Sequence, residues 1–369
     1  MNTLPTNHLP GISINPPETR SPIEINTLSE VGATAWDSFV GNTEGSLPTQ
    51  ISAWKDILHQ SYGLSLHFLA AQQDGHLLGV LPLYRVKSPF TGDSLQSMSG
   101  GVCATTHLAA QALISAADSL ARELDVDYLL LRDSRQAWDN CCLEILEAHR
   151  GVRLHLPAES ETAWNNLHKD LRYHIRSGTR RGNLEITVGQ SYVDEFYEVL
   201  LRGNHDKGTP LFSKKFLQNV TRSFTNGYNI AISFFEGEPT AGYFNLIHCN
   251  CIVGMWGATL RNHISLMPTH RLYWSLFEQA ISQGVTMVDM GRTAYPSSQY
   301  EFKAKWGDEI YPIYQLFTIY HGKTPPTLNI NKAINDHGGV STFRRVWSRL
   351  PLFMARTLGP IVRRQVPFG

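Results

Sequence analysis

The same succession of predicted elements occurs twice along this chain of 369 residues. Each half reads as two helices, a set of antiparallel strands, a further helix and a buried strand, as the periodicity of the apolar residues indicates. A succession repeated in this way predicts two similar α/β domains in tandem. The length agrees with two domains, because a single hydrophobic core seldom serves more than about 300 residues.

In the first half, two apolar runs flank Asp74-Gly75 in the segment LHFLAAQQDGHLLGVLPLYRV. Asp and Gly tolerate the positive φ angles of a two-residue turn, so the segment predicts a β-hairpin. Helical patterns lie around Trp36, from Trp54 to His59 and over residues 108–124. The apolar run VDYLLLRD predicts a central strand, because strands buried on both faces lack polar alternation.

In the second half, YNIAISFFEGEPTAGYFNLIHCNCIVGMWGAT predicts three consecutive antiparallel strands. A helix over residues 269–283 follows, with Gly284 as its C-terminal stop, and VTMVDM predicts the next buried strand. We therefore divide the chain into a disordered, proline-rich leader (1–22), an N-terminal domain (23–158), a C-terminal domain (159–322) and a basic tail (323–369).

The charge is unevenly distributed, although the formal net charge is zero. Residues 341–369 contain six arginines and no acidic residue, so residues 1–340 carry a net charge of −6. A body with this charge is not attracted as a whole to nucleic acid. The tail suits an acidic carrier protein or an anionic membrane surface. Pro351, Pro360 and Pro367 are expected to divide it into short pieces.

Other bulk features indicate a cytoplasmic protein. The first residues lack the basic and apolar regions of a signal peptide, and no apolar run approaches the ~18 residues of a membrane span. The five cysteines include no CxxC pair, so we expect reduced thiols. Through its tail the protein would attach peripherally at the inner face of the membrane.

The segment WNNLHKDLRYHIRSGTRR (residues 164–181) predicts an amphipathic helix with a cationic stripe opposite an apolar one. The stripe is a solvated surface or an anion-binding face. Cations spaced three and four residues apart repel one another, which favours a phosphate or carboxylate partner. The cations of the stripe are Lys169, Arg172, Arg176 and Arg180.

A second cationic position lies before the long helix of the second half, in TLRNHISLMPTHR. A helix N-terminus at this place can hold a pyrophosphate through its backbone N–H groups. The loop has no glycine, but His270 and Arg271 fall in the first helical turn. They are either simply exposed or meet an anion in place of a glycine loop.

The third candidate region runs from Asp289 to Trp306. A carboxylate at the end of a buried strand needs a partner, and Arg292 is the predicted one. In the following YEFKAKWG, the two lysines point the same way if the segment is extended. If it is helical, Phe302 and Trp306 stack at i,i+4. In both cases the aromatic pair anchors an arm that presents Lys303, flanked by Tyr300 and Lys305, to an anionic or oxyanionic group.

Several other chemistries find no support in the sequence. GxxxxGK[ST], GxGxxG, GxSxG and HExxH are all absent. The 15 histidines are not paired with carboxylates at ligand spacing, so no metal site is expected.

Several segments resemble one known family. LMPTHRLYWSLFEQAISQGVTMVDMGRTAYPSSQYEFKAKWGDEIYP resembles the C-terminal block of FemAB-like proteins in the GNAT acyltransferase superfamily, which ends in Phe-Lys-x-x-Trp-Gly. LRYHIRSGTRRG, GTPLFSKKFL and the tail VWSRLPLFMARTLGPIVRR are also similar, and most so to the subgroup associated with exosortase and exopolysaccharide systems. The resemblance implies an α/β (α+β) fold of tandem GNAT-like domains, each with a mixed, mostly antiparallel sheet flanked by helices.

The resemblance also implies transfer of an acyl or aminoacyl group to an amine of a cell-envelope or exopolysaccharide precursor. By similarity, Lys303 would stand near the transferred carbonyl, and Arg172 and Arg176 would meet phosphates. No cofactor would be bound permanently. The acyl donor would be acyl-CoA, an acyl carrier protein or aminoacyl-tRNA.

From the chemistry alone, Lys303 suits the oxyanion or a donor phosphate and Asp289 the base. Trp256 and Tyr243 would line an acyl or sugar pocket, or simply the core. Two alternatives remain: a carrier-protein-dependent acyltransferase and a non-catalytic GNAT-derived binding module in exopolysaccharide or protein-sorting systems.

Overall fold

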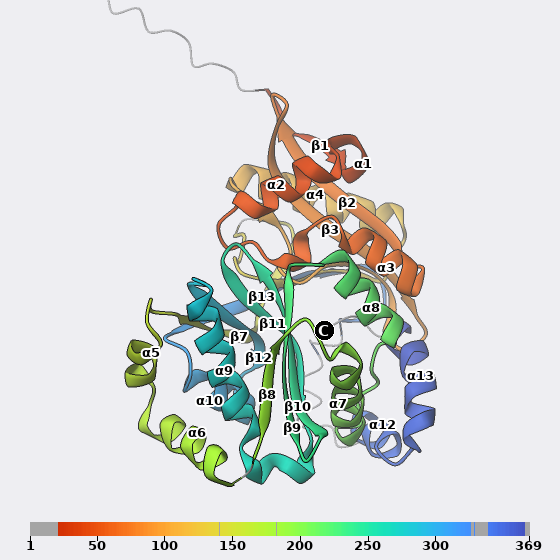
Figure 1. Cartoon of the computed structure of the whole chain (residues 1–369). Helices are drawn as coiled ribbons and strands as arrows, with labels where there is room; N and C mark the ends of the chain where they lie inside the picture. Colours follow the sequence, from red (N-terminus) through yellow and green to blue (C-terminus); the bar gives the residue numbers. More distant parts are fainter. Residues whose placement is uncertain (1–20, 140, 182, 326–327, 329–338, 366–369) are drawn as a thin grey trace, which may run out of the picture.

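A single sheet of 13 strands runs through both halves of the chain (Figure 1). The computed structural model describes residues 21–139, 141–181, 183–325, 328 and 339–365, so most of the predicted leader lies outside the described residues. The strands are β1 Glu24–Thr27, β2 Ser65–Gln73, β3 His76–Ser88, β4 Gly92–Ser97, β5 Cys103–Ala104, β6 Tyr128–Ser134, β7 Glu144–His155, β8 Glu185–Gly189, β9 Tyr228–Phe235, β10 Glu238–His248, β11 Cys251–Thr259, β12 Met287–Ala294 and β13 Glu309–Ile319.

The order of the strands is β1-β2-β3-β4-β6-β13-β7-β12-β11-β10-β9-β8, with β5 paired to β3. Pairing is antiparallel except for β4 with β6 and β11 with β12, which are parallel. Each half thus contributes an antiparallel set of strands followed by one parallel pair. The tandem, mostly antiparallel arrangement predicted from the sequence is confirmed.

Two strands lie outside their own half. β7 lies between β13 and β12, while β13 pairs with β6 of the first half. A boundary at 158/159 therefore separates two segments whose strands interleave at the centre of the sheet. The division into domains stays a prediction.

The helices are α1 Leu28–Val31, α2 Ala33–Asn42, α3 Trp54–Tyr62, α4 His107–Glu123, α5 Ser160–Asn166, α6 Lys169–Arg181, α7 Val193–Asp206, α8 Lys214–Ser223, α9 Pro268–Ser282, α10 Ser298–Ala304, α12 Gly339–Trp347 and α13 Leu352–Gln365, with 3-10 turns η1 Pro48–Gln50 and η2 Arg261–Leu266. The helices predicted around Trp36 and from Trp54 to His59 correspond to α2 and α3, whereas α7 and α8 of the second half were not predicted individually. The predicted hairpin forms as well, with φ of 51° at Asp74 and 77° at Gly75.

Two expectations about helices were wrong. The basic segment is not one helix, because Leu167 takes an extended conformation (φ −62°, ψ 140°) that separates α5 from α6 and buries its side chain. Pro360 does not break the tail, since it lies inside α13. There Ala355 and Gly359 are buried against the body, and this packing offsets the lost backbone hydrogen bond.

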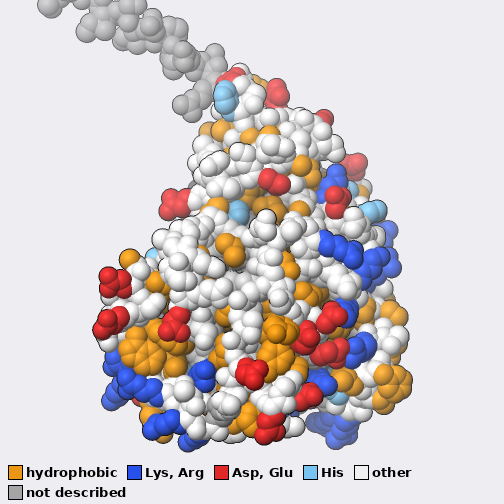
Figure 2. Space-filling view, in the orientation of Figure 1, with side chains coloured by type: hydrophobic (Ala, Val, Ile, Leu, Met, Phe, Trp, Pro, Cys, Tyr) orange, Lys and Arg blue, Asp and Glu red, His pale blue; other side chains and the backbone are white. Residues whose placement is uncertain are grey.

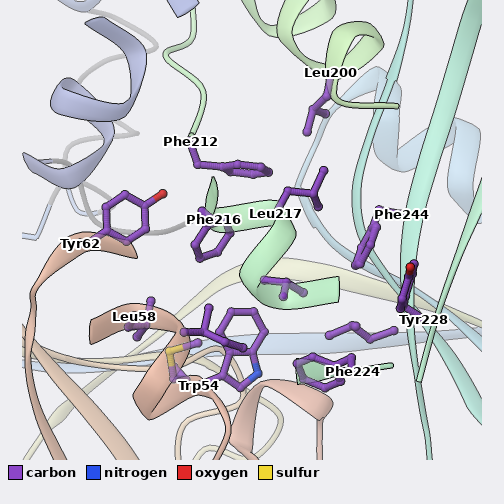
Figure 3. Packing of buried hydrophobic residues seen from close by; sticks show 14 of the residues in the cluster. Trp54, Leu58, Tyr62, Leu200, Phe212, Phe216, Leu217, Phe224, Tyr228 and Phe244 are labelled. Carbon is purple, nitrogen blue, oxygen red and sulfur yellow. The ribbon is translucent and has the colours of Figure 1, made fainter. Parts of the chain in front are cut away.

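One hydrophobic core joins the two halves (Figure 3). Trp54, Leu58 and Tyr62 of α3 meet Phe216 of α8 and Phe244 of β10 in it. Alternate residues of a strand face opposite sides of a sheet. Accordingly, other residues of the same strands belong to two further cores, one under α4 and one under α9. The shared core makes the interface between the halves a fixed part of the fold.

Candidate active site

The sheet opens where β11 and β12 stop pairing. Their parallel ladder ends at Val253 and Asp289, although both strands continue. Each also has an irregularity there: Met255 is an extra residue opposite β10, and the register of β12 against β7 shifts between Asp289 and Arg292. Bulges leave a residue outside the ladder and turn nearby groups in new directions. The backbone is thus exposed to a ligand in the middle of the sheet.

Two cavities meet at this opening. We call the first, of about 510 Å³, the α9 cavity, because α9 and the sheet form its walls. We call the second, of about 300 Å³, the α3–α8 cavity, because it lies between α3 of the first half and α8 of the second. The residues that line both cavities are Gly254, Met255, Trp256, Met290 and Lys303.

Lys303 is the cation at this junction. It lies near the end of α10, which begins after the N-cap Ser297. Its Nζ donates to the main-chain oxygens of Met290 at 2.7 Å and Arg292 at 3.3 Å. Burial lowers the pKa of Lys303 to about 8, although Asp289 acts in the opposite direction. The ammonium is therefore charged at neutral pH but releases its proton readily.

Aromatic side chains fix α10 in place. The segment is helical, and Phe302 and Trp306 make an edge-on contact with ring centroids 6.2 Å apart. The ring of His270 lies 5.2 Å from that of Phe302, also edge-on. Burial lowers the pKa of His270 to about 4, so its imidazole is neutral and does not bind an anion as a cation at pH 7. His270 acts in this cluster as an aromatic neighbour.

Asp289 does not pair with Arg292, so that prediction was wrong. Asp289 lines the α9 cavity, whereas Arg292 lines the α3–α8 cavity. Asp289 accepts instead from Tyr311 Oη at 2.7 Å and Arg135 Nη2 at 3.2 Å, and Arg153 Nε lies 3.5 Å away. Burial alone raises the pKa of Asp289, but these partners hold it below its ordinary value. A carboxylate held ionised in this way is a weak general base.

Arg292 contacts a carboxylate from the first half. Its Nη1 donates to Asp133 at 3.1 and 3.3 Å. Burial raises the pKa of Asp133, but Arg292 and Arg132 outweigh that effect and hold it well below its usual range. The pair connects the two halves at the floor of the α3–α8 cavity.

Comparison with known proteins identifies this region. Residues 165–304 match the family described as the acetyltransferase (GNAT) domain. The segment that lines the α9 cavity is thus similar to a GNAT acetyltransferase domain. No curated protein matches the chain in sequence.

Solved structures show the same fold across both halves. FemX aligns with a TM-score of 0.61 at 12% identity, over 85% of this chain and 100% of FemX. The C-terminal domain of a putative lysylphosphatidylglycerol synthetase from Agrobacterium fabrum aligns with 0.55 at 13% identity, over 83% of this chain and 96% of that one. A tandem GNAT protein from the clavulanic acid biosynthesis pathway gives 0.55 at 10% identity, over 82% and 100%. The fold is thus FemAB-like.

The matched segment brings together part of the predicted site. Lys303, Asp289, Trp256, Tyr243, His270 and Phe302 line the α9 cavity, and Arg292 lines the other. Trp256 and Tyr243 have core contacts as well, with Phe212 and Tyr273 respectively. Each of the two aromatic side chains therefore lines a cavity and also packs in the core, and their role in an acyl or sugar pocket stays a prediction.

Other predicted residues line neither cavity. Arg172 Nη1 donates to the Asn165 oxygen at 3.1 Å, and Arg176 lies over the Trp164 ring. Figure 2 shows the cations around α5 and α6 on the outer surface. Lys169 and Lys305 are exposed, and Trp306 is buried in the α9 core. Tyr300 contacts the Tyr295 ring, and Arg271 packs beside Gly178.

Four residues that line the two cavities were not predicted from the sequence. Met255 is marked only by Gly254 and Gly257, since glycine inside a strand often signals a bulge. Arg135, Asp133 and Arg363 line the α3–α8 cavity from outside the matched segment, and no local pattern distinguishes them. Among the described residues, no cluster of His, Cys, Asp and Glu suits a metal ion, and no helix is long and apolar enough to cross a membrane.

Proposed function

We propose that this protein is an N-acyltransferase or aminoacyltransferase whose two substrates meet at Lys303. The observation that carries the proposal is that two cavities on different sides of the opened sheet share this one cation. A transferase must bring donor and acceptor to a common point in the correct orientation.

The α9 cavity suits the acyl donor. Tyr243, Tyr273 and Phe277 give it an aromatic wall for an acyl or aminoacyl chain. The first turn of α9 and Lys207 also line it. A helix N-terminus and an ammonium favour phosphate groups, which acyl-CoA, acyl carrier protein and aminoacyl-tRNA all carry. The α3–α8 cavity then holds the acceptor amine.

The chemistry follows from this placement. The amine attacks the carbonyl carbon of the ester or thioester, a C–N bond forms, and negative charge develops on the carbonyl oxygen. Lys303 stabilises that charge as an ammonium ion. The C–O or C–S bond then breaks, and the proton lost by the amine goes to the leaving group through solvent. Asp289 orients Arg135 and Tyr311 beside the site.

The acceptor we propose is a cell-envelope or exopolysaccharide precursor. Support comes from the tail, which resembles the exopolysaccharide-associated subgroup, and from the names of FemX and of the lysylphosphatidylglycerol synthetase. The runner-up is a non-catalytic binding module, in keeping with the absence of a glycine-rich loop before α9.

Native mass spectrometry with acyl-CoAs, charged tRNA and acyl carrier protein tests the donor. Retention of one of them by the wild type supports the proposal and names the donor class. Lys303→Ala should then lower kcat/KM by about 30- to 1,000-fold, which corresponds to about 2–4 kcal/mol of transition-state stabilisation. Binding without turnover in the wild type would favour the binding module. If the wild type retains none of the donors, the transferase proposal is refuted.

The tail suggests where the reaction takes place. Val346, Phe353 and Ile361 on α12 and α13 are 57%, 69% and 60% exposed. Exposed arginines lie among them, and residues 339–365 contain no acidic residue. Figure 2 shows orange and blue side chains together along this edge. We propose that it contacts an anionic membrane surface. Co-sedimentation with phosphatidylglycerol but not phosphatidylcholine vesicles is expected, whereas binding only to acyl carrier protein would refute it.

A further inference from the structure

One peptide group connects Asp289 with Lys303. The peptide between Met290 and Gly291 donates its N–H to Asp289 Oδ1 at 2.7 Å, and its oxygen accepts from Lys303 Nζ, also at 2.7 Å. The N–H and the C=O of a trans peptide lie in one plane and point in opposite directions. The carboxylate on one side of the peptide therefore determines where the carbonyl oxygen meets the ammonium on the other side.

The backbone around Gly291 allows this orientation of the peptide. Gly291 has φ +70°, which L side chains rarely adopt, and a Cβ there would lie 2.8 Å from the Gly254 oxygen. In the sheet formed by the described residues, Met290 and Gly291 belong to neither neighbouring ladder. Pairing with β11 ends at Asp289, and pairing with β7 resumes only at Arg292. The peptide is thus held by side chains and not by neighbouring strands.

A buried tyrosine fixes the second oxygen of the carboxylate. Tyr311 donates its hydroxyl to Asp289 Oδ2 at 2.7 Å, and burial, together with the charge of Asp289, raises the pKa of Tyr311 well above its ordinary value. The hydroxyl therefore remains a donor. The ring lies against Gly151, where a Cβ would overlap it, and the guanidinium carbons of Arg135 and Arg153 lie 4.6 and 4.2 Å from the ring centroid. These contacts hold the ring in place, and the ring holds the carboxylate.

The charges of the two groups agree with this connection. Burial raises the pKa of Asp289, but its hydrogen-bonded partners and the nearby arginines hold it below its ordinary value, so the carboxylate stays ionised. Burial lowers the pKa of Lys303 to about 8, an effect that Asp289 opposes and Arg292 increases. The carboxylate thus favours the charged form of the lysine, the form that stabilises an oxyanion.

We infer that Asp289 is the positioning residue of Lys303: through the Met290–Gly291 peptide it places the ammonium at the junction of the two cavities. Tyr311 in turn holds the Asp289 carboxylate in the orientation that this requires. This role replaces the predicted role of Asp289 as the base. The inference rests on the proposed function only in taking Lys303 as the group that stabilises the oxyanion, since the hydrogen bonds exist without turnover.

The first test compares two replacements of Asp289 in the full chain. Asp289→Asn keeps an oxygen for the Gly291 N–H but loses the charge, whereas Asp289→Ala loses both. If Asp289 positions Lys303, kcat should fall about tenfold further in Asp289→Ala than in Asp289→Asn, with the KM for the donor changed by less than about threefold. Equal losses of kcat in the two variants would overturn the inference, because a general base is lost in both.

The anchor of the carboxylate gives a second variant. Tyr311→Phe should lower kcat by about three- to tenfold, because one hydrogen bond to Asp289 is lost. The pH at which activity falls on the alkaline side should stay the same, since the charge of Asp289 remains. If Asp289→Ala fails to fold, Tyr311→Phe decides, and a kcat equal to that of the wild type would overturn the inference.

A measurement that needs no turnover separates the inference from the proposed function. NMR of ¹³C-labelled lysine side chains gives the pKa of Lys303, whose signal is assigned by its absence in Lys303→Met. Asp289→Asn should lower this pKa by about one pH unit, because it removes the opposing charge. The matched control is Glu309→Gln, which removes a carboxylate that pairs with Arg153 at 3.0 Å and should leave the pKa of Lys303 unchanged.

The possible results of the titration are distinct. An unchanged pKa of Lys303 in Asp289→Asn would overturn the inference even in an active enzyme, as would an equal decrease in Glu309→Gln. A decrease confined to Asp289→Asn, in a protein that shows no turnover with any donor, would refute the transferase and leave the connection between Asp289 and Lys303 standing.

Discussion

Replacing Lys303 by methionine should stabilise the protein at neutral pH while removing its activity. The pKa of Lys303 falls from 10.5 to about 8 in the folded state, a difference of about 2.5 units. At 1.36 kcal/mol per unit, the charged ammonium costs at most about 3 kcal/mol of folding free energy at pH 7. Methionine avoids this cost but leaves the Met290 and Arg292 carbonyls without their Nζ donor, at about 1 kcal/mol each. A net gain of about 1 kcal/mol remains.

The pH dependence gives the sharper test. Between pH 8 and 10.5 the unfolded lysine keeps a proton that the folded one has released, so wild-type stability rises with pH in this window. Between pH 7 and pH 9.5 the free energy of unfolding of the wild type should rise by about 2 kcal/mol relative to that of Lys303→Met. The variant is then the more stable protein at pH 7 and the wild type at pH 9.5. Guanidinium unfolding at the two pH values measures the change. The exposed Lys305→Met should stay within about 0.5 kcal/mol of wild type throughout. A difference between Lys303→Met and wild type that does not vary with pH would refute the assignment of the cost to a buried charge.

Three further expectations concern the site and its supports. If Lys303 acts as a cation, kcat/KM should fall as pH rises through about 8, whereas a rise through that pH would mean that it acts as a neutral base. Gly291 has φ +70°, and a Cβ there would lie 2.8 Å from the Gly254 oxygen. Gly237 is the control, because its φ is also positive, at +80°, but a Cβ there would meet nothing within 4 Å. Denaturant unfolding should show that Gly291→Ala costs about 2 kcal/mol more stability than Gly237→Ala. Gly359→Val should release α13 from the body, because a side chain there would collide with the Leu211 oxygen. Faster proteolysis of the tail than in the wild type would show the release, and an equally resistant tail would contradict it.

The structural features that depend on residues close together in the sequence could be predicted from it. The Asp74-Gly75 hairpin, the long helices and the repeated succession of elements follow from periodicity and turn chemistry, which act over a few positions. The contact between Phe302 and Trp306 beside Lys303 follows from the same short-range spacing. The turn of Leu167 away from the helix was missed, because burial in the α9 core outweighed local propensity.

What the sequence did not supply depends on pairings between distant residues. Asp289 pairs with Arg135 and Arg153, and Arg292 with Asp133. These partners come more than 130 positions earlier, from β7, which lies beside β12, and from β6 and the connection after it. Arg292, the nearest cation in the sequence, was a poor guide to the partner of Asp289, because the two side chains line different cavities. Arg363 could be placed only once α13 was seen against β3 and α7.

The position of β7 between β12 and β13 delays its pairing during synthesis. β7 is complete at His155, yet its partner β12 begins only at Met287. With roughly 130 residues between them and a ribosome adding about 5–20 residues per second, β7 waits on the order of ten seconds with both edges unpaired. Unpaired edges recruit other chains. The nascent protein should therefore depend on chaperones that bind extended strands, and fragments that end before residue 287 should aggregate rather than fold as an isolated first half.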